Sequence, residues 1–323
     1  MMLDQVYQDC FRPVNRGYDA VFRAGRMSIG LVSPLERYDH GPVPEMTRHI
    51  ERVQLAEQLG FSAIWLRDVP FNVPSFGDAG QLYDPFVYLG LLAGVTERIA
   101  LGVSSVVLPL RHPAHVAKAA ASADALSGGR VILGVASGDR PQEYPALNLP
   151  FADRGERFRA SFDYINQVLR DRAAFDNVYG SPGDGMDMLP KPVSGKLPLM
   201  ITGGSQQSPE WIAQNGDGWM LYPRDPGLQA QIIGDWRQRV EASGRSVLPV
   251  MQPLYVDLVE SAPVRPQPIH LGYRLGLEQL QQYLLRLRQI GVNHVALNLR
   301  FNQADIEQTL RRLAQELLPA FHE

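Results

Sequence analysis

The stretch IALGVSSVVLPLRHPAHVAKAAASADALSGGRVILGVASGD spans residues 99–139. Two short runs rich in Val, Ile and Leu, 99–107 and 131–135, flank an alanine-rich segment, 114–126. Apolar β-branched runs of this length are typical of buried strands, and a longer segment with helical periodicity between them is typical of a crossover helix. The stretch therefore predicts a strand–helix–strand unit with two parallel strands.

The same alternation continues on both sides of this unit. Eight strands, each followed by a helix, close more naturally into a barrel than into an open sheet, because a barrel leaves no strand edge unpaired. We therefore predict an α/β fold, a single (β/α)8 TIM barrel. The predicted strands are Met27–Val32, Ala63–Leu66, Ile99–Val107, Val131–Val135, Leu199–Thr202, Gly218–Tyr222, Pro249–Val259 and His294–Leu299. The predicted helices are Glu45–Leu59, Pro85–Val95, Ala114–Leu126, Glu156–Leu169, Glu210–Gln214, Leu228–Ala242, Leu277–Ile290 and Ala304–Leu317.

Three segments do not fit the repeat. Residues 1–26 precede the first predicted strand, and we expect an N-terminal arm that covers the barrel bottom or a partner subunit, with the barrel domain at 27–323. Residues 172–196 are rich in Gly and Pro and predict an ordered excursion between the fourth helix and the fifth strand. Prolines in 261–274 forbid a helix there, so we expect a loop over the barrel mouth.

Composition narrows the classes of function. The 323 residues carry 31 Lys and Arg against 34 Asp and Glu, which predicts a small-molecule partner rather than nucleic acid or an anionic membrane surface. Cys10 is the single cysteine, so an intrachain disulfide is impossible and a cysteine-rich metal cage is excluded. Charged residues interrupt the N-terminus where a signal peptide needs an apolar run, and no apolar run approaches the roughly 20 residues that span a bilayer. We expect a soluble, cytoplasmic protein.

In such barrels the site lies at the carboxyl ends of the strands, so the residues just after each strand are the candidates. The turn after the fifth strand contains Gly203, Gly204, Ser205 and Gln206. Glycines allow a tight turn, and unsatisfied N–H groups at the following helix N-terminus favour an anion, so we expect a cofactor phosphate there. The alternative is an ordinary turn in which Ser208 is the helix N-cap and Pro209 takes the first helical position.

The ends of the third and fourth strands carry small residues that let a flat ring or its polyol chain approach the backbone closely. These residues are Ser104, Ser105, Ala136, Ser137 and Gly138. Asp139 and Tyr144 follow, and Asp139 is either a ligand of a polyol hydroxyl or a turn former. Trp219, in the sixth strand, either lines the pocket or packs in the core.

Arg67 and Asp68 end the second strand and are the candidate catalytic residues, with a mutual surface ion pair of little energetic value as the alternative. His112 and His115 are spaced i, i+3, but Pro113 opens a helix between them, so we favour helix capping over a metal site and predict no metal. Motifs of the GxSxG, HExxH, Walker A and post-strand GxGxxG types are absent from the sequence, which argues against hydrolases and ordinary nicotinamide-binding domains.

The stretch at 99–139 is very similar to the central signature of the luciferase-like flavin monooxygenases. LAEQLGFSAIWLRD at 55–68 and PLMITGGSQQSPEWIAQNGDGWMLYP at 198–223 continue the resemblance in the same order, over nearly all of residues 27–300. The resemblance implies a barrel that binds FMN, or in some branches a deazaflavin, with the ring over the strand ends and the phosphate on the loop after the fifth strand. It also implies a cis peptide bond at Ser104–Ser105.

The chain departs from many relatives at one position. They have a histidine for proton transfer after the acidic residue of the second strand, whereas here Val69 follows Asp68. That departure argues against the deazaflavin sugar-phosphate dehydrogenase type of chemistry.

The resemblance implies a monooxygenase in which reduced FMN and O2 oxidise a small organic substrate. Because no nicotinamide fingerprint occurs, we expect a separate flavin reductase to deliver the reduced FMN. Arg67 or Asp68 would assist the oxygen chemistry. Two alternatives stay open: a deazaflavin-dependent oxidoreductase that transfers hydride without O2, and a barrel that binds flavin without turnover. Relatives are usually dimers through the second and third helices, so the resemblance also implies a homodimer.

Overall fold

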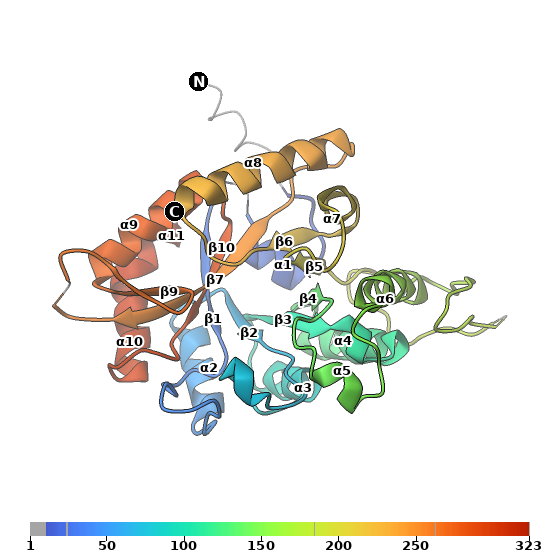
Figure 1. Cartoon of the computed structure of the whole chain (residues 1–323), viewed down its shortest axis with the longest axis horizontal. Helices are drawn as coiled ribbons and strands as arrows, with labels where there is room; N and C mark the ends of the chain where they lie inside the picture. Colours follow the sequence, from blue (N-terminus) through green and yellow to red (C-terminus); the bar gives the residue numbers. More distant parts are fainter. Residues whose placement is uncertain (1–10, 24, 184, 262, 323) are drawn as a thin grey trace.

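The computed structural model describes residues 11–23, 25–183, 185–261 and 263–322. Its centre is a closed ring of eight parallel strands: β1 (Ser28–Val32), β2 (Ala63–Leu66), β3 (Ala100–Val107), β4 (Val131–Ala136), β5 (Leu199–Thr202), β6 (Gly218–Met220), β7 (Val250–Leu258) and β10 (His294–Asn298). β10 pairs with both β1 and β7, which closes the ring (Figure 1). The predicted TIM barrel is confirmed, and each predicted strand is found within two residues of its predicted ends.

Helices surround the ring and leave the strand ends at its two rims (Figure 1). They are α1 (Arg16–Val21), α2 (His49–Gln58), α3 (Pro85–Val95), α4 (Pro113–Ser127), α5 (Glu143–Ala146), α6 (Arg154–Val168), α7 (Pro209–Asn215), α8 (Pro226–Ala242), α9 (Leu277–Gln289), α10 (Ile306–Arg312) and α11 (Pro319–His322), with 3-10 turns at Pro74–Phe76 and Leu108–Leu110. Every predicted helix is present, whereas α1 and α5 were not specified from the sequence. No helix in the described part of the chain is long and apolar enough to cross a bilayer.

The start of α2 differs from the prediction. The predicted helix began at Glu45, but α2 begins at His49. Met46 and Arg48 have φ angles of +59° and +54°, which a right-handed helix does not contain.

The helix predicted over 304–317 is not uniform. α10 gives way to a π-helical turn at Leu313–Leu317, in which the N–H of Leu318 donates to the carbonyl oxygen of Leu313. Pro319 follows directly, and a proline lacks an N–H and clashes with the carbonyl four residues before it. The wider turn accommodates both effects.

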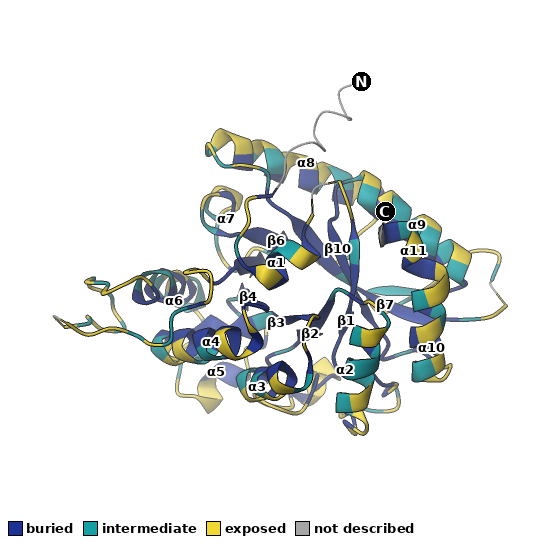
Figure 2. Cartoon of the chain, turned by 180° about the vertical axis from the view of Figure 1, so that it is seen from behind, coloured by how far each residue is buried: buried dark blue, intermediate teal, exposed yellow. Residues whose placement is uncertain are grey.

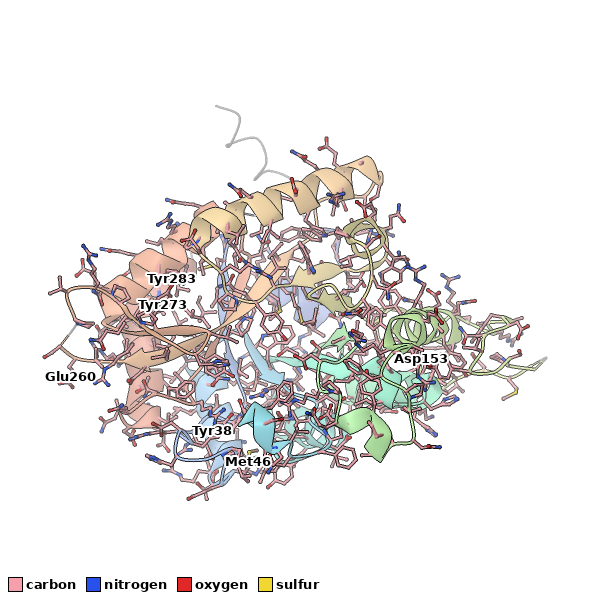
Figure 3. All side chains as sticks on the ribbon, viewed as in Figure 1. Tyr38, Met46, Asp153, Glu260, Tyr273 and Tyr283 are labelled. Atoms are coloured by element: carbon pink, nitrogen blue, oxygen red, sulfur yellow. The ribbon has the colours of Figure 1, made fainter. Side chains whose placement is uncertain are left out.

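The segment 261–274 was predicted as a loop, and that prediction was incomplete. It contains β8 (Gln267–Ile269) and leads into β9 (Gly272–Leu275), and these two strands form an antiparallel hairpin. β9 also pairs in parallel with the carboxyl half of β7. The prolines of the segment are compatible with this, because Pro268 lies in the outermost strand, where a missing N–H is tolerated. Tyr273 of β9 packs edge-on against Tyr283 of α9, with ring centroids 5.2 Å apart (Figure 3). The hairpin is therefore an extra wall at the carboxyl end of β7. The described residues of 172–196 form no helix or strand, as expected.

The described part of the N-terminal arm covers the barrel bottom. Phe11, Tyr18 and Phe22 pack against apolar side chains inside the ring. The strands of the ring are deeply buried (Figure 2). The Tyr18 hydroxyl donates to the main-chain oxygen of Asp217, just before β6, at 2.7 Å. Residues 1–10 of the predicted arm lie outside the described residues.

A series of buried hydrogen bonds connects α1, at the barrel bottom, to the strands. The Trp65 indole N–H donates to Nε2 of His294 at 2.8 Å, so the imidazole proton lies on Nδ1, 2.7 Å from Oγ of Ser28. Ser28 in turn donates to the Val21 carbonyl of α1. Burial lowers the pKa of His294 to about 3, so the imidazole is neutral at physiological pH. This series of contacts is neutral, whereas the Asn15 amide at the start of α1 donates to the Asp124 carboxylate at 3.1 Å.

Candidate functional site

The ends of β3, β4 and β5 lie side by side at the carboxyl rim. The Ser104–Ser105 peptide bond is cis, as the resemblance implied, and the pairing register between β3 and β4 shifts at these serines. The Ser105 hydroxyl hydrogen-bonds the Thr202 hydroxyl at the end of β5. Ala136, at the end of β4, is partly exposed beside them. The structure therefore brings together small residues that the sequence predicted as ring contacts.

The turn after β4 depends on Gly138. Its φ is +78°, and a β carbon there would lie 2.7 Å from Cγ1 of Val107. Tyr144 is fully buried and donates its hydroxyl to the main-chain oxygen of Ser137. Tyr144 therefore supports the turn from below and does not reach the open rim, whereas the neighbouring Asp139 is exposed.

The turn after β5 presents main-chain donors. Gly203, Ser205 and Gln206 all have left-handed φ angles, of +55°, +43° and +59°. Within the described residues, the N–H groups of Gly204, Ser205 and Gln206 donate to no protein oxygen. The Trp219 indole donates to the Gly203 carbonyl at 2.8 Å and fixes the turn from the barrel side. Successive free N–H groups in such a turn form a concave site for an anion.

The helix that follows this turn starts as the alternative interpretation predicted. Ser208 is the N-cap of α7, with its Oγ accepting the Trp211 N–H at 3.2 Å, and Pro209 takes the first helical position. The cap does not exclude an anion at the turn, because the free N–H groups of the turn precede this cap.

A cavity of about 620 Å³ opens beside the same turn, between α6 and the 172–196 segment. Arg159 of α6 lies in its wall and donates from Nε to Oε1 of Gln207 at 2.9 Å. The other lining residues include Gly155, Glu156, Asn177 and Gln206. The turn therefore has both a nearby cationic side chain and open space on its outer side.

Arg67 and Asp68 do not pair with each other, so the surface ion-pair alternative is wrong. Nη1 of Arg67 lies 2.8 Å from Oδ2 of Asp78. Asp68 is held by both arms of Arg111, with Nη2 at 2.7 Å from Oδ1 and Nε at 3.1 Å from Oδ2, and it accepts the Val107 N–H. Successive residues at a strand end face opposite sides, which explains two separate ion pairs.

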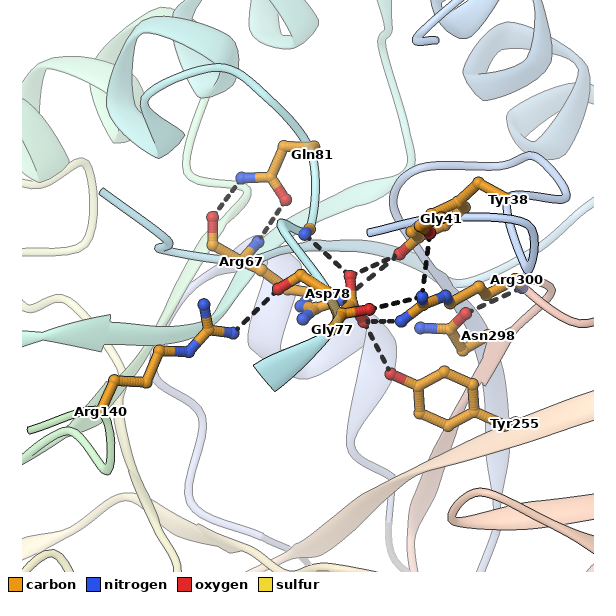
Figure 4. A network of polar contacts seen from close by, with 11 residues as sticks. Tyr38, Gly41, Arg67, Gly77, Asp78, Gln81, Arg140, Tyr255, Asn298 and Arg300 are labelled. Atoms are coloured by element: carbon orange, nitrogen blue, oxygen red, sulfur yellow. Dashed lines mark hydrogen bonds and ion pairs between the residues drawn. The ribbon is translucent and has the colours of Figure 1, made fainter. Parts of the chain in front are cut away.

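Asp78 is the centre of a polar network that the sequence did not reveal (Figure 4). Its carboxylate lies 2.9 Å from Nη1 of Arg300, and it accepts the Tyr38 hydroxyl at 3.0 Å and the Gly80 N–H at 2.9 Å. Burial alone would raise the pKa of Asp78, but Arg67, the Gly80 N–H and Arg300 outweigh burial and hold that pKa below its ordinary value. Arg300 follows the eighth predicted strand directly, so its position could have identified it, whereas Asp78 lies in an irregular segment without a pattern.

Glu143 is a second residue that the sequence did not single out. It is 2% exposed, and its Oε1 has no hydrogen-bond partner among the described residues. Burial raises the pKa of Glu143 to about 7, against the opposing effect of Arg140. A carboxyl group that titrates near neutrality close to a strand end can take up or release a proton. Nothing in the surrounding sequence indicated this burial.

His112 has the helix-capping role that was favoured, and His115 lies on the same helix with its ring 5.9 Å from that of His112. His112 is the N-cap of α4, and its Nδ1 accepts the Ala114 N–H at 3.3 Å. In the described ranges, no group of three or more His, Cys, Asp and Glu side chains is placed to hold a metal ion.

The chain belongs to the luciferase-like monooxygenase family, whose sequence profile matches residues 27–259. This family contains flavin monooxygenases and F420-dependent oxidoreductases, and F420 is a deazaflavin.

Individual relatives span both kinds of chemistry. The chain is 30% identical over 253 residues to the uncharacterized protein Rv0953c of Mycobacterium tuberculosis, covering 72% of this chain and 85% of that protein. It is 32% identical over 235 residues to 4-hydroxyprotoasukamycin monooxygenase of Streptomyces nodosus subsp. asukaensis, covering 69% and 61%.

Two solved structures share the fold at low sequence identity. An F420-dependent secondary alcohol dehydrogenase in complex with an F420-acetone adduct has a TM-score of 0.74 at 18% identity, covering 92% of this chain and all of that one. The oxygenating constituent of 3,6-diketocamphane monooxygenase from Pseudomonas putida, in complex with FMN, has a TM-score of 0.71 at 14% identity, covering 91% and 98%.

Replacing Glu143 by Gln tests the neutral state of this buried carboxyl. A folded-state pKa of about 7, above the unpaired value of 4.5, means that the native protein keeps a proton that the unfolded chain has lost between these pH values. Wild-type stability should therefore fall as pH rises from about 4.5 to 7, and Glu143→Gln should gain roughly 1–3 kcal/mol relative to wild type at pH 8 but little at pH 4.5. Urea unfolding across this range measures the difference, and a difference that does not change with pH would contradict the assignment.

Proposed function

We propose that this protein is an FMN-dependent monooxygenase that holds the flavin over the ends of β3 to β6. The observation that carries the proposal is the alignment at one rim of the Ser104–Ser105 bulge, the Gly138 turn and the three free N–H groups after β5. A flat ring needs close backbone approach, and a phosphate needs donors at one end of the ring. The two requirements are met side by side on neighbouring strands.

The residues present fit FMN in separate roles. The N–H groups of Gly204, Ser205 and Gln206 would hold the phosphate, with Arg159 supplying positive charge nearby. Ser104, Ser105, Ala136, Ser137 and Gly138 would lie against the ring and ribityl chain, with Asp139 at the exposed edge. Trp219 and Tyr144 would act from beneath, each by fixing a turn through its hydrogen bond.

FMN in its reduced form would supply the electrons that activate O2 for transfer of one oxygen atom to an organic substrate. Asp78 holds the Arg67 guanidinium in place, and Arg67 would stabilise negative charge that develops on the reacting atoms close to β2. Asp68 is neutralised by Arg111, so we assign it a positioning role: it holds the Arg111 side chain and the end of β3. Glu143, at the start of α5 (Glu143–Ala146), would carry a proton. A separate reductase and a cytoplasmic location stay predictions.

Similarity to 4-hydroxyprotoasukamycin monooxygenase and the FMN complex of the 3,6-diketocamphane enzyme support the choice of an FMN monooxygenase. A deazaflavin-dependent hydride transferase is the second candidate, supported by the F420-dependent alcohol dehydrogenase. The specific observation in its favour is the cavity of about 620 Å³ beyond the phosphate turn, which has room for the start of a longer cofactor tail.

The reaction type is tested by measuring flavin affinity and O2 consumption together. FMN should bind more tightly than F420. When reduced FMN and O2 are supplied with a panel of organic substrates, at least one substrate should yield an oxygenated product, with O2 uptake coupled to its formation. Tighter binding of F420, with substrate oxidation that proceeds without O2, would replace the proposal by the second candidate. Flavin binding with no turnover on any substrate would favour a non-catalytic barrel.

The phosphate position is tested by Gly204→Asp. Open space surrounds the position of a β carbon at Gly204, so the aspartate can be accommodated, and its charge would repel the phosphate. FMN affinity should fall about 10- to 100-fold, whereas riboflavin, which lacks the phosphate, should be affected little. Gly204→Asn is the matched neutral control and should keep FMN affinity. Equal losses for FMN and riboflavin would place the phosphate elsewhere.

We also propose a homodimer through α3. Val87 and Leu91 on its outer face are 73% and 41% exposed, and Gly90 and Gly94 complete the same face with open space around them. An exposed apolar helix face with small residues suits close packing of two copies. Sedimentation should show a dimer that Val87→Glu converts to a monomer, and a wild-type monomer would refute the interface.

A further inference from the structure

The rim is divided between two kinds of strand end. The turns after β4 and β5 begin with small residues, whereas the charged side chains of Arg67 and Arg300 follow β2 and β10. Three arginines, Arg67, Arg140 and Arg300, surround Asp78 and are named here the arginine cluster (Figure 4). They come from the ends of β2, β4 and β10, and the closed ring brings them together.

The arginine cluster has more positive than negative charge. Arg67 and Arg300 share the single carboxylate of Asp78, at 2.8 Å and 2.9 Å. Arg140 contacts this residue only through its main-chain oxygen, at 3.2 Å, and so its charge is not neutralised there. Among the other acids nearby, Asp68 is taken by Arg111 and Asp139 is exposed. Glu143 is buried and close enough to interact electrostatically with Arg140, but within the described residues its Oε1 has no hydrogen-bond partner and it forms no ion pair with Arg140. Buried charges are costly unless they are paired, so a surplus of this kind indicates a missing anion.

Unused donors point the same way. Nη1 of Arg140 and Nε of Arg300 are buried and have no hydrogen-bond partner among the described residues. Both side chains belong to residues less than a tenth exposed, at 9% for Arg140 and 8% for Arg300. The hydroxyls of Tyr38 and Tyr255 donate their single protons to the Asp78 carboxylate, at 3.0 Å and 3.5 Å, so the unused donors of the cluster are those of the arginines. Buried donors of this strength are almost always satisfied in a functional state.

An apolar surface lies next to these donors. The Arg140 guanidinium stacks on Phe76 at 4.6 Å from the ring centroid, and Phe76 is still 41% exposed. Phe71, on the same segment after β2, is 39% exposed. An apolar body can therefore pack on Phe76 while its anionic end faces the arginines.

We propose that the arginine cluster binds the carboxylate of the organic substrate, with Arg140 as the principal ligand, so that the substrate is an organic acid with an apolar body. This inference rests on the proposed function, because it places the acid beside the flavin, between the Gly138 turn that Arg140 follows and the ends of β2 and β10. Guanidinium groups match a carboxylate in a planar, two-pronged arrangement, which lysine does not reproduce. The cofactor phosphate and the substrate carboxylate would then occupy opposite sides of one mouth.

Benzoate and its uncharged analogue benzamide are the probes. Titrated into FMN-loaded protein at fixed ionic strength, benzoate should bind at least about 10-fold more tightly than benzamide, as measured by calorimetry and by change in the flavin spectrum. Arg140→Met keeps an apolar contact with Phe76 but removes the charge, and should weaken benzoate about 10- to 100-fold without changing benzamide. Arg140→Lys should recover part of the affinity. Arg224→Met removes one exposed arginine after β6 and is the charge-matched control, which should leave benzoate binding unchanged.

The outcomes separate this inference from the proposed function. FMN binding with no preference for benzoate over benzamide would overturn the inference and leave the function standing. Absence of FMN binding would overturn the function, while calorimetry of benzoate on the flavin-free protein still tests the arginine cluster. Equal weakening by Arg140→Met and Arg224→Met would show a general effect of charge and overturn the site. Inorganic phosphate that displaces benzoate and binds more tightly would also overturn it, because the cluster would then be a phosphate site.

Discussion

Closure of the strand ring between β1, β10 and β7 is the constraint on which the rest of the molecule depends. Parallel pairing places every carboxyl end at one rim, so residues distant in the chain meet there without any long-range motif. Tyr38 and Arg300 both contact Asp78 for this reason. The opposite rim is covered by α1, which the neutral His294 joins to the strands through Ser28.

The rim is specialised by strand. On one side the main chain supplies the chemistry, through a bulge, a glycine turn and free N–H groups, which suits a large planar cofactor with a phosphate. On the other side the side chains supply it, through buried arginines that share too few carboxylates. This separation would keep the proposed anionic substrate and the proposed anionic cofactor from competing for the same donors.

The sequence predicted the parts of this arrangement that depend on local pattern. Strand ends, most helix limits and the turn at Gly203 to Gln206 followed from apolar runs, glycines and position in the repeat. Ion pairing did not follow, because it depends on which strands become neighbours: Arg67 turned out to pair with Asp78, and Asp68 with Arg111. The burial of Glu143 and the hairpin at β8 and β9 also depend on tertiary packing. Small residues beside the rim, and Arg67 and Asp68, could thus be selected from the sequence, whereas the partners of the charged residues could not.

A crystal structure of the FMN-bound protein tests the division of the rim most directly. The account predicts phosphate oxygens within hydrogen-bond distance of the N–H groups of Gly204 to Gln206, with the ring against Ser104–Ser105 and the arginine cluster free of cofactor. A phosphate bound by Arg140 or Arg300, or a ring lying over β10 and β1, would contradict the account.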